Sequence, residues 1–320
     1  MKHNSTLRAQ LVEALANGQF HSGAKLAEQF DLSRTAIANN IAALQALGLD
    51  VYSVKGKGYA LAKPLTLLSE RVISEYLAPS VQPQLTLLPV IHSTNTYVKD
   101  NIEQMPQGAV VVAEAQTAGR GRRGRQWVSP FAASLYLSIC WRFQGGYQQI
   151  GGLSLFVGDC VLKALQSLKV DGLGVKWPND IYRHGRKLGG ILVEVEGQIG
   201  SEVSCIIGIG INVDLPDLES QIDQPFNDLS DLNIDRNHLC AALVNTLHQQ
   251  MPDFEENGLA NIVDSWNQYD VFAKREVAII SQDNTLRGMN LGINVQGALQ
   301  LQTATGVRDI HGGEVSLRGA

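Results

Sequence analysis

A run of arginines and glycines lies between two strongly apolar stretches, and it constrains the fold more than any other feature of this chain. Residues 119–125 are Gly-Arg-Gly-Arg-Arg-Gly-Arg, and the stretches over 109–115 and 134–141 have the apolar character of strands. Glycines let the backbone curl and expose N–H groups, and arginine forks suit phosphate or carboxylate. The segment therefore predicts an anion-binding loop inside a folded domain. The alternatives are an RNA-binding run and a solvated charged loop.

Length and composition favour a globular chain of two or three domains. The chain has 320 residues, of which 44% are hydrophobic and 18% charged, so disorder and fibre repeats are excluded. We expect no membrane span, since no apolar run approaches the roughly 20 residues that one needs, and no signal peptide. We also expect a cytoplasmic location with reduced thiols and no zinc ribbon, because no CxxC motif links the four cysteines, Cys140, Cys160, Cys205 and Cys240.

The first 63 residues have the pattern of a winged helix-turn-helix. Apolar periodicity predicts a helix over 5–17, and Ser22 and Ser33 are suitable N-caps for two further helices. Two short alternating strands around Lys55-Gly-Lys-Gly58 predict a hairpin wing. Residues 1–63 carry a net charge of +3, which leaves −8 for the remainder of a chain whose total is −5. A basic head on an acidic body indicates two separate roles.

Several side chains of this head are suited to DNA contacts. Asparagine can read adenine, arginine can read guanine or a phosphate, and lysines on the wing can contact phosphates. The residues that we expect to contact DNA are Ser22, Arg34, Thr35, Asn39, Asn40, Lys55 and Lys57. The third helix is poor in positive charge, so a module for packing or dimerisation is the alternative.

The rest of the chain predicts an α+β fold, because its strands and helices do not alternate strictly. The expected strands span 85–91, 109–115, 134–141, 190–196 and 203–211. The expected helices span 95–104, 152–168, 236–252 and 258–268. From Val277 onward only short strands are indicated (277–280, 285–289, 298–303 and 314–318), which predicts a small terminal barrel of about 48 residues. The expected domains are 1–63, 67–271 and 272–320.

Three further segments predict one pocket together with the arginine loop. They are Lys176-Trp-Pro-Asn-Asp180 with Lys187 and Gly189-Gly190, the glycine-bearing strand that ends at Asn212, and His92-Ser-Thr-Asn95. The alternative interpretations are that Lys187 is a surface lysine whose ammonium reaches solvent and that the His92–Asn95 segment is an ordinary helix N-cap. No metal cluster, Ser-His-Asp triad or nucleophilic cysteine is indicated. Lysine and arginine suit negative charge that develops at phosphorus, which favours adenylation of a carboxylate by ATP.

These motifs, in this order, resemble those of the biotin protein ligases. The matching segments are GRGRRGR at 119–125, KWPND at 176–180, KLGGILVE at 187–194 and GIGIN at 208–212. With the winged helix in front, the whole chain is similar to the bacterial proteins that act as both biotin ligase and biotin operon repressor. The resemblance implies a central mixed-sheet domain similar to class II synthetases and an SH3-like C-terminal barrel.

The resemblance also implies the chemistry. ATP and biotin would form biotinyl-5′-adenylate, and a lysine of the biotin carboxyl carrier protein of acetyl-CoA carboxylase would take the biotin. Mg²⁺ would accompany ATP, with Asp180 as a candidate ligand. The adenylate-bound protein would form a homodimer on the biotin operator, and an exposed sheet edge near 188–195 is our candidate for the pairing.

The same resemblance assigns roles to individual residues. Lys187 and Arg122 would be catalytic. The biotin-binding residues would be Ser93, Thr94, Asn95, Gln116, Gly119, Arg120, Gly121, Arg122, Lys187 and Gly190. The ATP or adenylate side would be formed by Arg122, Arg125, Trp127, Asn179, Asp180 and Asn212. An acidic stretch over 214–231 would cover adenine, with Leu218, Ile222 and Phe226 as its apolar candidates.

Three other hypotheses remain open at this point. The chain could be a ligase whose winged helix binds no DNA. It could use lipoate or octanoate in place of biotin. It could also be a non-enzymatic RNA binder that uses the arginine run.

Overall fold

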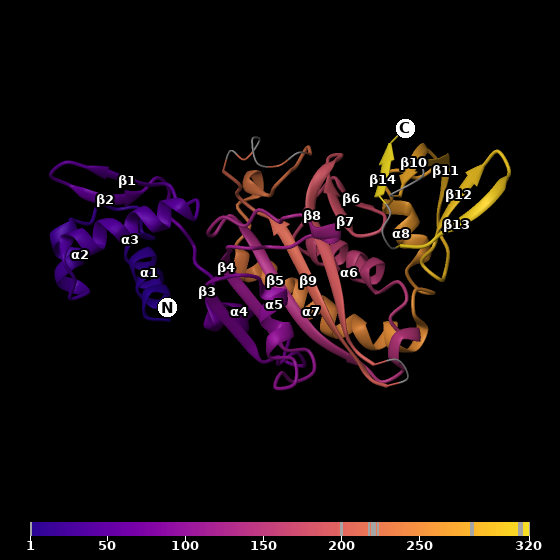
Figure 1. Cartoon of the computed structure of the whole chain (residues 1–320), viewed down its shortest axis with the longest axis horizontal. Coiled ribbons are helices and arrows are strands. Elements are labelled where there is room, and N and C mark those ends of the chain that lie inside the picture. Colours follow the sequence, from indigo (N-terminus) through magenta and orange to yellow (C-terminus); the bar gives the residue numbers. More distant parts are fainter. Residues whose placement is uncertain are drawn as a thin grey trace.

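The computed structural model describes residues 2–198, 201–216, 218, 222, 224–281, 285–312 and 316–319, without the side chains of residues 2–6 and 316. A helical N-terminal unit, a large central sheet and a smaller C-terminal sheet follow one another along the long axis (Figure 1). No helix in these ranges is both long and apolar enough to cross a bilayer.

The N-terminal unit has the expected winged helix-turn-helix arrangement. Its elements are α1 (Lys2–Leu15), α2 (Gly23–Gln29), α3 (Arg34–Ala46), β1 (Val51–Val54) and β2 (Gly58–Leu61). Ser22 and Ser33 cap α2 and α3, because each Oγ accepts a backbone N–H at 3.1 Å. The apolar faces close on a core that includes Leu11, Ile37 and Leu44, all with no exposed surface.

The central sheet is mixed, as predicted. Its strands are β3 (Leu85–Ile91), β4 (Val110–Gln116), β5 (Ser134–Phe143), β6 (Leu173–Lys176), β7 (Asp180–Arg183), β8 (Arg186–Gly197) and β9 (Val203–Asn212). They lie in the order β3-β4-β5-β9-β8-β7-β6, and only the β3–β4 pair is parallel. The apolar runs of β4 and β5 are buried because helices cover both faces of the sheet.

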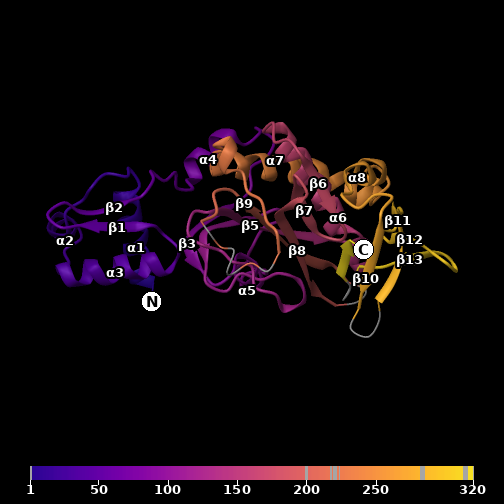
Figure 2. The same ribbon diagram turned by 90° about the horizontal axis from the view of Figure 1, so that it is seen from above.

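Figure 2 shows α4 and α7 on one side of the sheet and α5 on the other. The helices are α4 (Glu70–Tyr76), α5 (Thr94–Asp100), α6 (Leu153–Ser167), α7 (Arg236–Asn257) and α8 (Val263–Tyr269). Short 3₁₀ turns span Arg122–Gly124, Gly146–Gln148 and Ser230–Leu232. The main core lies between the sheet and the layer of α6 and α7, where the rings of Phe143, Phe156 and Phe254 meet.

The C-terminal strands form one antiparallel sheet. They are β10 (Glu276–Ile280), β11 (Thr285–Ile293), β12 (Leu299–Thr303), β13 (Gly306–Ile310) and β14 (Ser316–Gly319), in the order β13-β12-β11-β10-β14. Apolar side chains of this sheet, such as Val277 and Leu299, belong to the same core as the central domain. The expected boundary between residues 271 and 272 therefore falls between units that share a core, and all the expected domain boundaries stay predictions.

Several predicted element bounds were wrong. Strands β7 and β13 were not foreseen, because polar residues interrupt their short patterns. The predicted helix over 236–252 continues to Asn257 through Pro252, because Phe254, which is 1% exposed, packs into the core. The predicted helix over 258–268 begins only at Val263.

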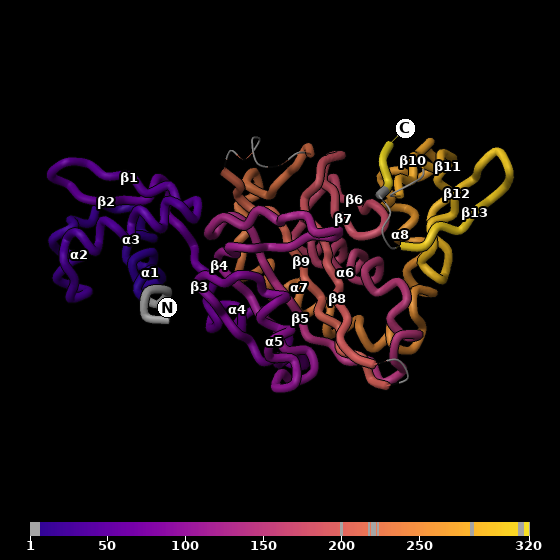
Figure 3. Tube along the Cα trace, viewed as in Figure 1, coloured from indigo at the N-terminus to yellow at the C-terminus, as the bar shows by residue number. Residues whose placement is uncertain are grey.

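A buried ion pair attaches the connection between the first two units to the sheet. Figure 3 follows this connection from β2 to β3. Arg236 and Glu114 are each 4% exposed and are 2.7 Å apart. The other Glu114 oxygen accepts the N–H of Leu68, and Arg236 donates to the carbonyl of Thr66. The connection therefore has a fixed course over the central sheet.

Candidate functional site

One cavity, of about 370 Å³, gathers most of the side chains that the sequence singled out. It lies where the start of α5, the arginine loop, the β6–β7 turn and the glycine-bearing parts of β8 and β9 meet. Of the predicted residues, its wall includes Ser93, Thr94, Asn95, Gln116, Arg120, Gly121, Arg122, Arg125, Trp127, Asn179, Asp180, Lys187, Gly190 and Asn212.

The polar end of the cavity is built by the turn from β3 into α5. Ser93 caps the helix, which leaves Thr94 and Asn95 buried at 4% exposure each. Gln116 Oε1 accepts the N–H of Thr94 at 2.8 Å, and Ser138 Oγ lies 2.6 Å from Asn95 Oδ1. Each group is held by a neighbour before any ligand arrives. This end is therefore preorganised for a small, neutral, polar head group.

The floor of the cavity needs glycine because other groups approach its backbone closely. A Cβ on Gly208 would lie 2.3 Å from Asn95 Oδ1, and a Cβ on Gly210 would lie 2.7 Å from the Trp127 indole. At Gly190 the same indole would be 3.3 Å away. Trp127 therefore lies across the two strands, and no other residue type fits at Gly208 or Gly210 without displacing a neighbour.

The arginine loop closes on itself. Trp127 donates its N–H to the carbonyl of Gly119 at 2.8 Å, and Gly121 donates to Arg125 at 2.7 Å. Arg123 has a left-handed backbone, with φ of 58°. The glycines and this turn let four arginines follow one another without leaving the domain. The loop is thus a folded wall of the cavity, in agreement with its predicted place between two strands.

Within the loop, Arg122 and Arg120 have different surroundings. Arg122 donates to Asn179 Oδ1 at 3.1 Å, and burial lowers the pKa of its guanidinium although Asp180 opposes this. Arg120 forms an ion pair with Glu194 at 2.8 Å, at the mouth of the cavity. Glu194 also accepts a hydrogen bond from Asn95. Arg120 was expected to wrap an acyl-adenylate, and in this structure its guanidinium is engaged by Glu194.

Lys187 lies inside β8 and forms a close ion pair. Its Nζ is 2.6 Å from Asp180 Oδ1, and both side chains are about 15% exposed. The ammonium also lies 5.4 Å from the centre of the Trp127 ring. The strand predicted over 190–196 would begin only after Lys187. The structure instead pairs Lys187 with Tyr182 of β7, a strand that Asp180 opens.

Three cationic residues of the cavity wall, Arg123, Lys176 and Arg318, were not assigned a role from the sequence. Lys176 is 7% exposed and lies 3.9 Å from Asp180 Oδ2, and burial lowers the pKa of its ammonium. It belongs to the KWPND motif, which was a usable signal. Arg318 comes from β14, and nothing near it in the sequence indicated this place. Among the described residues, seven cationic side chains and one carboxylate, that of Asp180, line the cavity.

The side of the cavity toward Asn212 is covered by the acidic stretch that follows β9. Asn212 Nδ2 donates to the carbonyl of Asn227 at 3.0 Å. Ile222 and Phe226 line the cavity, whereas Leu218 is buried at 5% exposure and does not. Residues 217, 219–221 and 223 of this stretch lie outside the described residues. Two of the three expected apolar candidates thus line the cavity, and their role toward adenine stays a prediction.

The expected DNA-contacting residues divide into an exposed group and a group whose side chains are hydrogen-bonded. Arg34, Thr35 and Asn39 are exposed on α3, and Lys55 and Lys57 are exposed on the wing turn. Asn40 is half-buried, because its amide donates to Ala36 O and its Oδ1 accepts from Arg8. The Ser22 hydroxyl is used as a cap. Asn40 is therefore the expected contact that this structure supports least.

Two features bear on metal binding and on the expected pairing of two protomers through the edge of β8. In the described ranges, no three His, Cys, Asp or Glu side chains gather in a way that would hold a metal ion. Strand β7 pairs with β8 only as far as Gly190. The expected free edge near 188–195 is therefore covered over 188–190, while 193–197 has a described strand partner, β9, on one side only.

Comparisons with known proteins match all three parts of the chain. The biotin/lipoate A/B protein ligase family model matches residues 87–212, a helix-turn-helix model matches 7–60, and a biotin protein ligase C-terminal domain model matches 275–318. The bifunctional ligase/repressor BirA of Escherichia coli is 43% identical over 100% of this chain and 99% of that protein. The BirA of Bacillus spizizenii is 32% identical over 98% and 99%. The structure of a biotin protein ligase from Aquifex aeolicus with biotin and ATP aligns with a TM-score of 0.66 at 26% identity, covering 74% of this chain and 99% of that one.

Proposed function

This chain belongs to the family of bifunctional biotin ligase/repressors, and from this premise we propose that its cavity joins biotin to ATP as biotinyl-5′-adenylate and then passes biotin to a lysine of the biotin carboxyl carrier protein. The observation that carries the proposal is the arrangement of one cavity, which has a neutral polar end, a glycine floor and a cationic end. A ureido head group, a flat apolar chain and a carboxylate beside phosphates need those three surfaces in that order.

The polar end takes the ureido ring. Ser93, Thr94, Asn95 and Gln116 offer donors and acceptors that are already fixed by Ser138 and by one another. The thiophene ring and acyl chain lie over Gly190 and Gly208, where a side chain would collide. Because a buried polar group without its partner costs free energy, this end discriminates against a ligand that lacks a polar head, such as octanoate.

The cationic end carries out the chemistry. A carboxylate oxygen of biotin attacks the α-phosphorus of ATP, the bond to the β-phosphate oxygen breaks, and pyrophosphate leaves. Lys187 and Arg122 stabilise the negative charge that develops on the phosphoryl oxygens, and neither forms a bond to the acyl group. Asp180 holds the Lys187 ammonium in place through their 2.6 Å contact. The amine of the carrier lysine then attacks the acyl carbon, and AMP leaves.

The remaining residues hold the nucleotide and exclude water. Asn179, Asn212 and Arg125 line the nucleotide end, and Trp127, Ile222 and Phe226 supply its apolar surfaces. Gly119 and Gly121 let the loop fold tightly beside the linkage. One carboxylate, Asp180, is enough for Mg²⁺ that arrives on ATP phosphates, since such ions keep several waters. Bound Mg²⁺ would neutralise charge on the phosphates.

Biotin-dependent exchange of pyrophosphate into ATP tests this proposal. Exchange with biotin, but not with octanoate or lipoate, is the expected result. Absence of exchange with biotin would contradict it.

The four cysteines are buried thiols in the structure, which agrees with action in the cytoplasm.

The repressor role uses the N-terminal unit. Arg34, Thr35 and Asn39 of α3 contact base edges, and the wing lysines contact phosphates of the biotin operator. The adenylate is the corepressor, and two protomers pair through the part of β8 over 193–197 that β7 leaves uncovered. Retardation of a promoter fragment from biotin genes, with and without biotin plus ATP, separates this role from a ligase that binds no DNA.

A further inference from the structure

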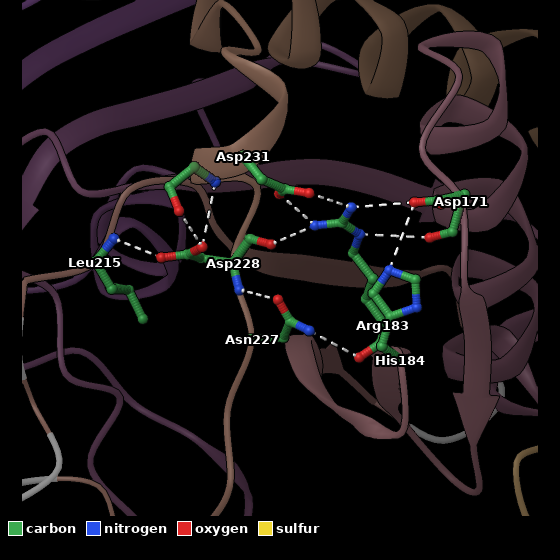
Figure 4. Close-up of polar contacts among 8 residues, drawn as sticks. Asp171, Arg183, His184, Leu215, Asn227, Asp228 and Asp231 are labelled. Carbon is green, nitrogen blue, oxygen red and sulfur yellow. Dashed lines mark hydrogen bonds and ion pairs between the residues drawn. The ribbon is translucent and has the colours of Figure 1, made fainter.

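Arg183, the last residue of β7, has a fully engaged buried guanidinium that the chemistry above does not use. Its side chain is 3% exposed, although it is charged. All five of its N–H donors have acceptors: two on Asp231, two on Asp171 and one at the carbonyl of Asp228. Figure 4 shows these contacts converging on the one guanidinium. A buried arginine with every donor satisfied holds its partners firmly.

The three partners come from two separate segments. Asp171 lies in the turn between α6 and β6, whereas Asp228 and Asp231 belong to residues 224–232, the covering segment, which follows β9. The Asp231 contact is bidentate, at 2.6 and 2.8 Å. The side chains of Asp171 and Asp231 are more than half exposed, so they contact the buried Arg183 guanidinium from the protein surface. Arg183 thus fastens the covering segment to β7.

The covering segment also runs directly beside Lys187. Asn227 donates its N–H to the carbonyl of Lys187 at 2.8 Å, and Lys187 donates its own N–H to Pro225 at 3.3 Å. Asn227 Nδ2 donates to the carbonyl of Arg183 at 3.1 Å. Phe226, between these two bonded residues, lines the cavity. The position of this aromatic wall therefore depends on how the segment is anchored on both sides.

We propose that Arg183 is a positioning residue for the nucleotide half of the site: through Asp231 it fixes the covering segment, so that Phe226 and the backbone around Lys187 are in place before the nucleotide binds. It touches no reacting atom. Loss of this anchor leaves the polar end of the cavity unchanged and lets the segment move away from the nucleotide. The inference rests on the proposed ligase function and adds a residue that controls retention of the intermediate.

Two matched variants test it, because Asp231 and Asp171 bind the same guanidinium from different segments. Asp231→Ala removes the bidentate carboxylate contact to the covering segment, and Asp171→Ala removes the carboxylate contact to the α6–β6 turn. The backbone carbonyls of Asp228 and Asp171 still accept from Arg183 in both variants. We expect Asp231→Ala to release loaded adenylate roughly tenfold faster and to raise the KM for ATP by a similar factor. We expect Asp171→Ala to stay within about twofold of the unaltered chain, because the α6–β6 turn contributes no described residue to the cavity wall.

Arg183 itself supplies two further arms. Arg183→Met should behave as Asp231→Ala does, and Arg183→Lys should fall between, because a point charge cannot hold Asp231 bidentately. In the ligand-free protein, hydrogen exchange over 224–232 should quicken in Arg183→Met, while exchange in α5 stays the same. The KM for biotin should stay within about twofold in every variant.

The outcomes are distinguishable. Faster adenylate release from Asp231→Ala than from Asp171→Ala, at equal melting temperatures, supports the proposal. Equal release from the two aspartate variants, whether fast or slow, overturns it, even if Arg183→Met fails to fold. A full chain that shows no biotin-dependent pyrophosphate exchange overturns the ligase proposal as well, and this is known before any variant is made.

Discussion

At the scale of the single residue, the contact between Lys187 and Asp180 gives the site its most direct test. Lys187→Ala should lower the rate of adenylate formation by roughly 10²–10³, the effect of losing one preorganised charge contact, or about 2.7–4 kcal/mol of barrier. Lys187→Arg should restore only part of the rate, because a planar fork differs from a point charge. Pyrophosphate exchange measures both variants.

The control for the Lys187 variants is their melting temperature, which reports whether they are folded. Removal of Lys187 leaves Lys176, 3.9 Å from the same carboxylate, as the remaining cation beside Asp180, so the variant should stay folded with a somewhat lower melting temperature. A Lys187→Ala chain that exchanges pyrophosphate at the unaltered rate would contradict the catalytic assignment.

Gly208 gives a test of the polar end alone. A Cβ there would meet Asn95 Oδ1 at 2.3 Å, so Gly208→Ala should displace that amide from its place beside Ser138. We expect the KM for biotin to rise by roughly tenfold or more, since a misplaced buried amide no longer meets its partner, while the KM for ATP changes little. Steady-state exchange at varied biotin and ATP separates the two constants. A rise in both constants would show that the floor and the cationic end are not independent.

At the scale of the element, we expect the arginine loop to control how long the intermediate stays bound. Arg122→Gly removes a half-buried cation that bonds Asn179, and we expect the adenylate to leak into solution. The leak should appear as biotin on lysines of an unrelated protein incubated with the variant, biotin and ATP. Background labelling, together with unaltered adenylate retention, would contradict the role of Arg122.

The elements also show which parts of the fold could be predicted from the sequence. The arginine loop, β3, β9 and the wing were predictable because local apolar alternation and glycine turns define them. Strand β7 was not, since four residues with a charged end give no period, and its place depends on Arg183 meeting aspartates 12 and 48 residues away. Arg318 reaches the cavity only through the docking of the C-terminal sheet. Long-range pairs of this kind leave no trace in a local pattern.

Within the site, residues of local motifs could be predicted, whereas their contacts with residues distant in the sequence could not. Asn179 and Lys187, which line the cavity, could be predicted because each belongs to a compact motif. The engagement of Arg120 by Glu194, and of Asn40 by Arg8, could not be foreseen, because each partner lies more than 30 residues away.

At the scale of the whole molecule, the cavity and the DNA-binding unit should be coupled through dimerisation. A unit with a net charge of +3 makes few phosphate contacts, so a monomer should bind DNA weakly, and two linked copies should bind far better. We expect biotin plus ATP to convert monomer to dimer and to raise operator affinity together. Analytical sedimentation, paired with operator titration, follows both.

A charge on the uncovered edge of β8 is the control for that coupling. Val195→Lys on the half-buried edge should weaken dimerisation and operator binding while pyrophosphate exchange continues. Oligomeric state and operator affinity that both ignore the ligand would instead favour a ligase that binds no DNA.

The fluorescence of Trp127 should report whether the cavity is occupied. Of the four tryptophans, Trp141, Trp177 and Trp266 are at most 6% exposed, whereas Trp127 is half-buried against Gly210 and its indole N–H has no hydrogen-bond partner among the described residues. A ligand that excludes water from this ring should move its fluorescence to shorter wavelength, and Trp127→Phe should abolish the change. Filling and emptying of the cavity then become a spectroscopic signal that needs no label, and unchanged emission while adenylate forms would place the ring away from the ligand.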